Sequence, residues 1–262
     1  MSSFLEEQFG LSGRTAVVIG ATGEIGGALA EGLCRAGANT VVVGRSAEAG
    51  KKRAAEFSDM PRGGDAAFIP CDTTSKSDLK HLVDEVDDTF GRIDVWVNSA
   101  GTNSDTPFLE IEEDEWDHIM DVNLKGAFLA CQVAGEYLIE QGEGGSIINI
   151  SSMAALTPLS KVFTYGASKA GLVNLSENLA REWAPDGIRV NCIAPGFFPA
   201  EQNREILSEE RVSAIMRQTP AGRFGEAEEL VSTALLLASD KAGSFITGAH
   251  VAVDGGFSSM AL

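Results

Sequence analysis

The sequence has few of the residues that mark a disulfide-stapled, metal-binding or membrane-spanning chain. The four cysteines are widely separated, without a C-x-x-C pair, and the three histidines do not cluster with them. This spacing indicates reduced, buried thiols in a cytosolic protein, and it predicts no metal site. No apolar run approaches the ~20 residues that cross a bilayer, and the N-terminus lacks the basic segment of a signal peptide. We therefore expect a cytoplasmic location.

Basic residues are also scarce. Lys and Arg together number 20 against 38 Asp and Glu, the formal net charge is −18, and only eight of the basic residues are Lys. Such a charge repels nucleic acids and anionic membranes, so neither is an expected partner. An acidic, lysine-poor surface fits either adaptation to high salt or ordinary solubility, and the sequence leaves both open.

The chain does contain a regular alternation of short β-branched runs and longer helical patterns. The runs occupy residues 15–19, 40–43, 66–69, 93–97, 146–150, 189–193 and 249–253, and the helical patterns occupy 24–36, 75–90, 113–140, 165–183 and 226–238. Nearly every residue of each run is apolar, as in strands that are buried on both faces of a parallel sheet. The alternation predicts one doubly wound, Rossmann-type α/β domain over residues 1–262, with seven parallel strands and helices on both faces.

Ligands of such sheets bind beyond the carboxyl ends of the strands. After the first predicted strand the sequence reads Gly20-Ala-Thr-Gly23-Glu-Ile-Gly26-Gly27 and then continues as a helix. Glycines let the backbone turn sharply and approach a pyrophosphate, to which the start of the helix offers N–H donors. The turn therefore predicts a dinucleotide cofactor.

The end of the second predicted strand bears on which dinucleotide binds. Sites for NAD usually place a carboxylate there for the ribose 2′-hydroxyl. Here the strand ends on Gly44, Arg45 and Ser46, without a carboxylate. Because a guanidinium suits a 2′-phosphate, this segment favours NADP, with NAD as the alternative and a solvated surface charge as the plainer interpretation of Arg45.

Three polar residues form the candidate catalytic group. Tyr165 and Lys169 are four residues apart on a predicted helix, so they lie on one face of it, and Ser152 follows the fifth predicted strand. An ammonium near a phenol favours the phenolate, so we expect Lys169 to lower the pKa of Tyr165 toward neutrality. Tyr165 would then serve as a general acid or base, with Ser152 holding the reacting oxygen.

These motifs resemble those of the short-chain dehydrogenase/reductase family along nearly the whole chain. The matching segments are the glycine turn, Asn98-Ser-Ala-Gly101, Asn123, Ile150-Ser-Ser152, Tyr165-x-x-x-Lys169, Pro195-Gly196, Thr247-Gly248 and Val253-Asp-Gly-Gly256. The resemblance implies an enzyme that transfers a hydride between NAD(P) and a carbonyl or secondary alcohol.

The resemblance also implies roles for single residues. Tyr165 exchanges a proton with the substrate oxygen, Lys169 lowers the pKa of Tyr165 and binds the nicotinamide ribose, Ser152 polarises the carbonyl, and Asn123 holds a water that relays protons. Asp72 contacts the adenine, and the segment from Asn98 to Gly101 lines the ribose. The implied cofactor site comprises Gly20, Thr22, Gly23, Ile25, Gly26, Arg45, Ser46, Asp72, Thr73, Asn98, Ala100, Gly101, Tyr165, Lys169, Pro195, Gly196 and Phe198.

The sequence departs from the family pattern at several positions. Ile19 stands where the glycine turn usually begins with Thr, and Glu24 stands at the place of its middle Gly. A carboxylate beside a pyrophosphate would be repelled, so we expect Glu24 to point away from the cofactor. Ser99 replaces an Asn, and the Thr that usually touches the nicotinamide carboxamide falls near Ala200.

Residues at about 196–223 are the expected lid over the substrate. The segment resembles family members that act on sugar acids, such as D-mannonate/fructuronate reductases and gluconate dehydrogenases. Gln202, Asn203 and Arg204 suit hydroxyls and a carboxylate, and Lys161 is a second candidate for binding the anion, although solvated lid charges are an equally fair interpretation. The predicted substrate site comprises Ser152, Met153, Lys161, Tyr165, Gln202, Asn203 and Arg204.

Other functions stay open. Reduction of a 3-oxoacyl group or another small ketone is the main competitor, although an acidic acyl carrier protein would need a basic patch that the sequence does not display. An enzyme that acts on a steroid or another lipophilic alcohol would be expected to have a more apolar lid. A non-catalytic NAD(P)-binding sensor is the alternative of another class, and sugar-nucleotide epimerases usually need a longer C-terminal region. The family resemblance further suggests a homotetramer in which the helices at 113–140 and 165–183 pair across an interface.

Overall fold

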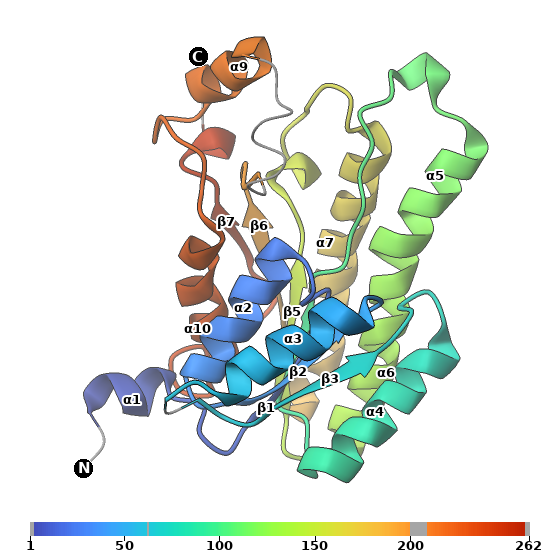
Figure 1. Cartoon of the computed structure of the whole chain (residues 1–262). Helices are drawn as coiled ribbons and strands as arrows, with labels where there is room; N and C mark the ends of the chain where they lie inside the picture. Colours follow the sequence, from blue (N-terminus) through green and yellow to red (C-terminus); the bar gives the residue numbers. More distant parts are fainter. Residues whose placement is uncertain (1–2, 62, 200–208, 260–262) are drawn as a thin grey trace.

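The computed structural model describes residues 3–61, 63–199 and 209–259, and its centre is one parallel sheet (Figure 1). The strand order is β3-β2-β1-β4-β5-β6-β7, and all the pairings are parallel. The strands are β1 (Thr15–Ile19), β2 (Asn39–Gly44), β3 (Ala66–Pro70), β4 (Val95–Asn98), β5 (Gly145–Ile150), β6 (Ile188–Pro195) and β7 (His250–Val253). The prediction of a doubly wound, seven-stranded sheet is confirmed.

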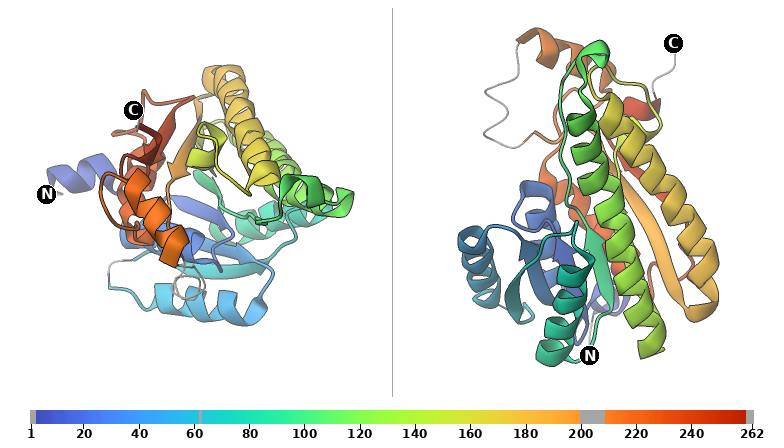
Figure 2. Two further views of the ribbon diagram at one scale, coloured as in Figure 1. Left: turned by 90° about the horizontal axis from the view of Figure 1, so that it is seen from above. Right: turned by 90° about the vertical axis from the view of Figure 1, so that its right-hand side faces the viewer.

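Helices cover both faces of the sheet, as the views in Figure 2 show. The α-helices are α1 (Phe4–Phe9), α2 (Glu24–Arg35), α3 (Ala47–Ser58), α4 (Lys76–Phe90), α5 (Glu113–Met120), α6 (Gly126–Gln141), α7 (Phe163–Trp183), α9 (Glu209–Gln218) and α10 (Val231–Ala238). Short 3₁₀ segments lie at Phe108–Glu110, Met153–Ala155, Ala184–Asp186, Ala227–Leu230 and Phe257–Ser259. Within the described ranges, none of the helices has both the length and the apolar character that a bilayer crossing requires.

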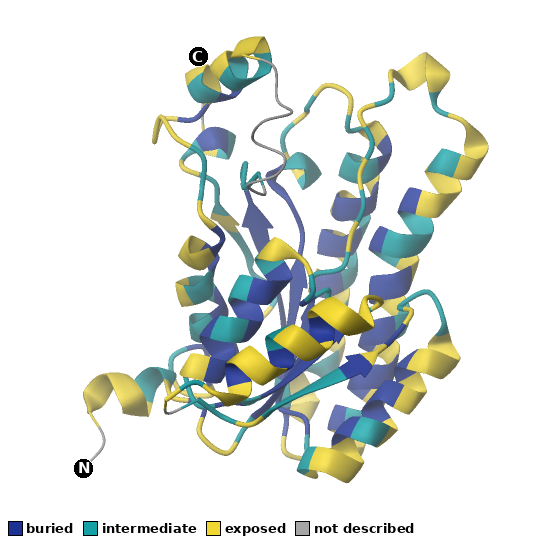
Figure 3. Cartoon of the chain, in the orientation of Figure 1, coloured by how far each residue is buried: buried dark blue, intermediate teal, exposed yellow. Residues whose placement is uncertain are grey.

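The core divides into two layers because side chains alternate along each strand. On β1, Ala16 and Val18 pack with α2, α3 and α10, whereas Val17 and Ile19 pack with α4, α6 and α7. The central strands are buried on both sides (Figure 3), which explains their uninterrupted apolar sequences. All four cysteines are buried free thiols, as predicted.

The helix predicted over residues 113–140 is interrupted. Between α5 and α6, Asp121–Lys125 form a π-helical segment that includes Asn123. Apolar spacing does not reveal one wider turn, and such turns often occur at functional sites. The predicted start of α4 is confirmed, because the Ser75 hydroxyl accepts a hydrogen bond from the Asp78 N–H.

Two helices were absent from the prediction. α1 has no buried residue, and α3 buries only Gly50, Ala54 and Phe57, so neither has the broad apolar stripe on which the prediction depended. At the other end of the chain, the helix predicted over residues 226–238 begins as a 3₁₀ turn and becomes α-helical only at Val231.

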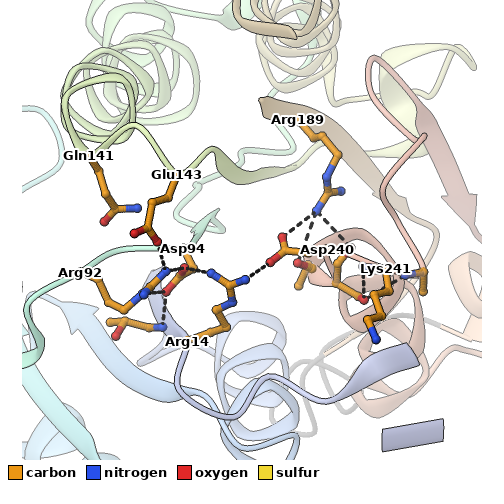
Figure 4. Close-up of polar contacts among 12 residues, drawn as sticks. Arg14, Arg92, Asp94, Gln141, Glu143, Arg189, Asp240 and Lys241 are labelled. Atoms are coloured by element: carbon orange, nitrogen blue, oxygen red, sulfur yellow. Dashed lines mark hydrogen bonds and ion pairs between the residues drawn. The ribbon is translucent and has the colours of Figure 1, made fainter. Parts of the chain in front are cut away.

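A charged cluster closes the amino end of the sheet, opposite the strand ends that face the cofactor motifs (Figure 4). Its centre is Asp94, which lies directly before β4 and is 6% exposed. The Asp94 carboxylate accepts hydrogen bonds from Arg14 Nη1 at 2.7 Å, from the Thr15 N–H at 2.8 Å, and from Arg92 Nε and Nη2 at 2.8 and 2.6 Å. Arg92 also pairs with Glu143 at 2.9 Å. This cluster ties the start of β1 to the start of β4.

Candidate active site

The glycine turn after β1 is compact enough that side chains would obstruct it. Gly20 has φ +79°, and a Cβ built there would lie 2.7 Å from the Ala100 nitrogen. A Cβ on Gly26 would lie 2.4 Å from the Gly20 carbonyl oxygen. Gly23 is the N-cap of α2 and supplies no side-chain cap, so the first N–H groups of this helix remain available to an anion. The turn therefore fits a dinucleotide pyrophosphate.

A cleft of about 540 Å³ opens beyond this turn. The predicted cofactor residues that line it are Gly20, Thr22, Gly23, Arg45, Asp72, Thr73, Ala100 and Gly101. The Thr22 side chain lies over the backbone of Gly44, where a Cβ would come within 2.6 Å of its Oγ1. Hydrogen bonds from the Thr74 N–H and hydroxyl, aided by the charge of Arg45, lower the pKa of Asp72. Asp72 is therefore an ionised hydrogen-bond acceptor beside a cation.

Other predicted cofactor residues lie elsewhere. Ile25, Tyr165, Lys169, Pro195, Gly196 and Phe198 line an adjoining cavity. Gly26 is buried beneath the turn, and Ser46 is exposed outside the cleft lining, where it caps α3. Glu24 is exposed and does not line the cleft, in agreement with the expectation that it points away.

Asn98 does not reach the cleft with its side chain, contrary to the predicted ribose contact. Its Oδ1 accepts a hydrogen bond from Trp96 Nε1 at 2.9 Å, and its Nδ2 donates to Asn149 Oδ1 at 2.8 Å. Asn149 in turn donates to Ser176 Oγ at 2.8 Å. These buried amides join β4 to β5 and α7, so Asn98 fixes the backbone at Ser99 and Ala100, which do line the cleft.

The three candidate catalytic residues meet in the adjoining cavity, which has a volume of about 340 Å³. Ser152 follows β5, while Tyr165 and Lys169 lie on one face of α7. Lys169 Nζ donates a hydrogen bond to the Ile150 carbonyl at 2.8 Å and lies 5.6 Å from the centre of the Tyr165 ring. Ser99, Gly101 and Thr102 line both spaces, so the cavity is continuous with the glycine cleft.

The pKa of Tyr165 runs against the expectation. Burial raises it, and a hydrogen bond with Ser152 lowers it by less. Burial also lowers the pKa of Lys169, to about 8. The ammonium is directed to the Ile150 carbonyl rather than to the phenol oxygen, so its influence on the phenol is smaller than the spacing suggested. In this arrangement Ser152 is the group that favours the phenolate.

Asn123 lies in the π-helical segment and anchors the loop after β4. Its Oδ1 accepts a hydrogen bond from the Thr102 N–H at 2.7 Å, and its Nδ2 donates to the Thr102 carbonyl at 2.8 Å and to Ser168 Oγ at 3.1 Å. A Cβ on Gly101 would lie 3.4 Å from Asn123 Oδ1 and 3.5 Å from Lys169 Nζ. Asn123 is thus close to Lys169, with its amide engaged by the protein.

The predicted substrate residues are only partly brought together. Met153 is buried and lines the cavity with Ser152 and Tyr165. Lys161 is exposed, has φ +62° and does not line the cavity, because its loop directs Leu159 and Val162 inward instead. Gln202, Asn203 and Arg204 lie outside the described residues, as does Ala200.

The start of the lid segment packs on the part of the chain that follows the lid. The rings of Phe197 and Phe257 make an edge contact with centroids 5.4 Å apart. Phe198 lies against Gly225, where a Cβ would come within 2.3 Å of the ring. After the undescribed residues, the segment continues as the helix α9, which begins with Glu209 and Glu210. Phe197 and Phe198 therefore form a fixed apolar wall of the cavity.

Several residues that line the two spaces were not predicted from the sequence. The missed residues include Thr74, Thr102, His118, Asp121 and Val122 in the cleft and Asn103, Ser151, Leu159, Val162 and Phe197 in the cavity. Thr74, Thr102 and Ser151 follow strand ends, so the strand-end rule could have found them. The residues contributed by α5 and the π-helical segment are brought there only by the fold. His250 was also missed: its Nε2 lies 2.8 Å from Ser151 Oγ.

A glycine cleft that fits a dinucleotide, continuous with a cavity that holds Ser152, Tyr165 and Lys169, defines an NAD(P)-dependent oxidoreductase. A family model described as Enoyl-(Acyl carrier protein) reductase matches residues 20–258. The chain belongs to the short-chain dehydrogenase/reductase family.

Individual relatives cover nearly the whole chain. D-threitol dehydrogenase of Mycolicibacterium smegmatis is 38% identical over 95% of this chain and 94% of its own length. The 3-oxoacyl-(acyl-carrier-protein) reductase FabG of Thermotoga maritima is 35% identical over 94% of this chain and 98% of its own. The solved structure of a gluconate 5-dehydrogenase from Burkholderia cenocepacia, in complex with NADP and tartrate, superposes with a TM-score of 0.91 at 34% identity, covering 98% of this chain and 99% of that one.

Proposed function

We propose that the protein is an NADP-dependent dehydrogenase or reductase of a small polyhydroxylated substrate, a sugar acid such as an aldonate, a keto-deoxy acid or a hexuronate. The observation that carries the proposal is the meeting of Ser152, Tyr165 and Lys169 where the glycine cleft opens into the second cavity. A bound nicotinamide cofactor supplies or accepts the hydride.

The residues of the chain would supply the proton and the orientation. The Ser152 hydroxyl binds the substrate oxygen and holds it beside the phenol of Tyr165. Tyr165 gives its proton to that oxygen in reduction and takes it back in oxidation. Lys169 presents its ammonium to the cofactor ribose, and the hydrogen bond from Ser152 favours the charge that develops on the phenol. Asn123 keeps the loop at Thr102 in place beside these groups.

The size of the cavity supports a small substrate. A space of about 340 Å³ that also receives the nicotinamide suits a substrate of the size of a sugar acid. Thr102 and Asn103 offer polar groups to substrate hydroxyls. Among the described lining residues Lys169 is the only cation, so the carboxylate would have to be bound by the lid residues Gln202, Asn203 and Arg204. The similarity to a D-threitol dehydrogenase and to a gluconate 5-dehydrogenase supports a polyol or sugar-acid substrate.

A substrate panel tests this proposal. Aldonates, 2-keto-3-deoxy acids, hexuronates, neutral polyols and a 3-oxoacyl thioester are compared with NADP(H) and NAD(H), by following cofactor absorbance. The highest kcat/KM is expected for a sugar acid. A clear preference for the thioester would contradict the proposal. It would indicate 3-oxoacyl reduction, the activity named for the Thermotoga maritima relative. Binding of cofactor without turnover of any compound would favour a sensor.

Arg45 is the residue on which the preference for NADP depends. We expect Arg45→Ala to lower kcat/KM for NADPH by roughly 10- to 100-fold, because hydrogen bonds to a charged group contribute about 1.5–3 kcal/mol. The kcat/KM for NADH would stay nearly unchanged. Arg35→Ala, which removes an exposed arginine paired with Glu31 at the far end of α2, is the matched control. A wild-type enzyme that prefers NADH would contradict the assignment.

We also propose a cytoplasmic homotetramer, built in part by a second copy packing on α5, α6 and α7. These helices, with the π-helical segment between α5 and α6, carry a mainly apolar groove of about 480 Å³ that includes Leu124, Phe128 and Leu175. Phe128 is 40% exposed. We expect Phe128→Lys to yield smaller particles in sedimentation velocity, because the lysine charge would be desolvated in the interface. Phe4→Lys, on the exposed helix α1, is the control. Wild-type protein that sediments as a monomer would refute the proposal.

A further inference from the structure

Arg53, on α3, lies behind the glycine turn rather than in the cleft. Its Nη1 donates hydrogen bonds to the carbonyl oxygens of Ala21 and Gly23, both at 2.9 Å. The residue is half-buried and is not part of the cleft lining. One guanidinium nitrogen thus holds two carbonyls of the turn from the side away from the cofactor.

Gly27 provides the room that this guanidinium occupies. A Cβ built on Gly27 would lie 1.1 Å from Arg53 Nη1 and 2.3 Å from its Cζ. The neighbouring Gly26 has a different neighbour, since its Cβ would meet the Gly20 carbonyl oxygen at 2.4 Å. The two consecutive glycines therefore serve separate contacts: Gly26 lets the turn close on itself, and Gly27 lets Arg53 lie flat against α2.

The charge of Arg53 has no ion-pair partner among the described residues. None of the ion pairs between described residues includes it, although the adjacent Lys52 pairs with Glu56. A half-buried cation without a counter-charge is unfavourable by itself. An anion bound on the opposite side of the same turn would offset that cost.

We propose that Arg53 is a positioning residue for the cofactor. By holding the Ala21 and Gly23 carbonyls back, it keeps the N–H groups of the turn directed to the pyrophosphate. The proposal rests on the use of NAD(P) by this family and not on the sugar-acid substrate, so a failure of the substrate panel leaves it standing.

A double-mutant cycle tests this role. Arg53→Met, Gly27→Ala and the double variant are compared in the Kd for NADPH, or for NADH if it binds more tightly, and in kcat at saturating cofactor. Each single variant is expected to raise the Kd about tenfold, with kcat nearly unchanged. The double variant is expected to match the single ones, because Gly27→Ala acts by displacing a guanidinium that the double variant no longer has.

Lys52→Met is the matched control, because it removes the same charge from an exposed position on the same helix. Its Kd should equal that of the wild type. Gly27→Ala is expected to fold, because alanine favours a helix interior. The atoms that its Cβ would meet belong to the flexible end of the Arg53 side chain. A wild-type Kd in Arg53→Met, or losses that add in the double variant, would overturn the proposal.

Discussion

Replacing Tyr165 by Phe is expected to lower kcat by a factor of about 10²–10⁴, the range that positioned general acids contribute. The substitution removes one oxygen atom from a ring that is otherwise retained in the cavity with Ser152 and Lys169. Apart from Tyr165, Lys169 is the only acid or base among the described residues that line the cavity. Its ammonium is directed to the Ile150 carbonyl, so it does not replace the phenol in exchanging a proton with the substrate oxygen. Steady-state rates together with a cofactor titration measure the effect.

The chain offers a close control for this experiment, because it contains only two tyrosines. Tyr137 lies on α6, where its hydroxyl is hydrogen-bonded to Asp87 far from the cavity. Tyr137→Phe should leave kcat near the wild-type value, and the Kd for the cofactor should be close to wild type in both variants. Undiminished turnover in Tyr165→Phe would refute the proposed mechanism.

The largest loss of stability is expected from Asp94→Asn. The amide would leave Arg14 and Arg92 without their shared carboxylate and would turn one acceptor into a donor facing the Thr15 N–H or a guanidinium. Removing one partner of a buried ion pair costs about 3–5 kcal/mol, here reduced by the partial exposure of the arginines. We expect the free energy of unfolding to fall by about 3 kcal/mol and Tm to fall by about 8 °C. Denaturant and thermal unfolding measure these changes.

The loss should depend on pH in a definite direction. Burial alone would raise the pKa of Asp94, but the hydrogen bonds from Arg92, the Thr15 N–H and Arg14 outweigh it and lower the pKa. A carboxylate whose pKa is lower in the folded state stabilises the fold above its unfolded pKa of about 3.9, and this contribution is lost as the pH falls through the folded pKa. The difference in the free energy of unfolding between wild type and Asp94→Asn should therefore become smaller at acidic pH.

Asp240→Asn is the control for this position. Asp240 pairs with the other terminal nitrogen of Arg14 and lies 4.0 Å from Arg189 Nη2. Because Asp240 is half-exposed, its removal should cost only about 1 kcal/mol. Equal losses in the two variants would mean that Asp94 stabilises the fold no more than a surface ion pair does.

Most of the sheet could be predicted because its signal is local. β1 is a run of apolar residues that the structure buries completely, and the glycine turn follows it within the same segment. The π-helical segment at Asn123 could not be predicted in this way, since its wider turn leaves the spacing of apolar residues almost unaltered. α3 was missed because its buried face is narrow.

In the candidate site, too, features set by neighbouring residues could be predicted, whereas features set by tertiary contacts could not. The spacing of Tyr165 and Lys169 placed them on one helical face, but the pKa of Tyr165 depends on burial and on Ser152, which only the fold determines. Likewise, the contact of Arg53 with Ala21 and Gly23 joins residues about thirty positions apart. Asn98 belongs to the family's pattern, yet its side chain points into the sheet rather than to the cofactor.

The burial of all four cysteines has a practical consequence. Burial raises the pKa of Cys34, of Cys71 and Cys131 to about 12, and of Cys192 to about 11, so at neutral pH almost no thiolate is present to react. A cysteine introduced on the surface, for example at Lys161, would then be the preferred target of a maleimide dye. Fluorescence labels could thus report on the loop beside the active site in a protein that keeps its natural cysteines.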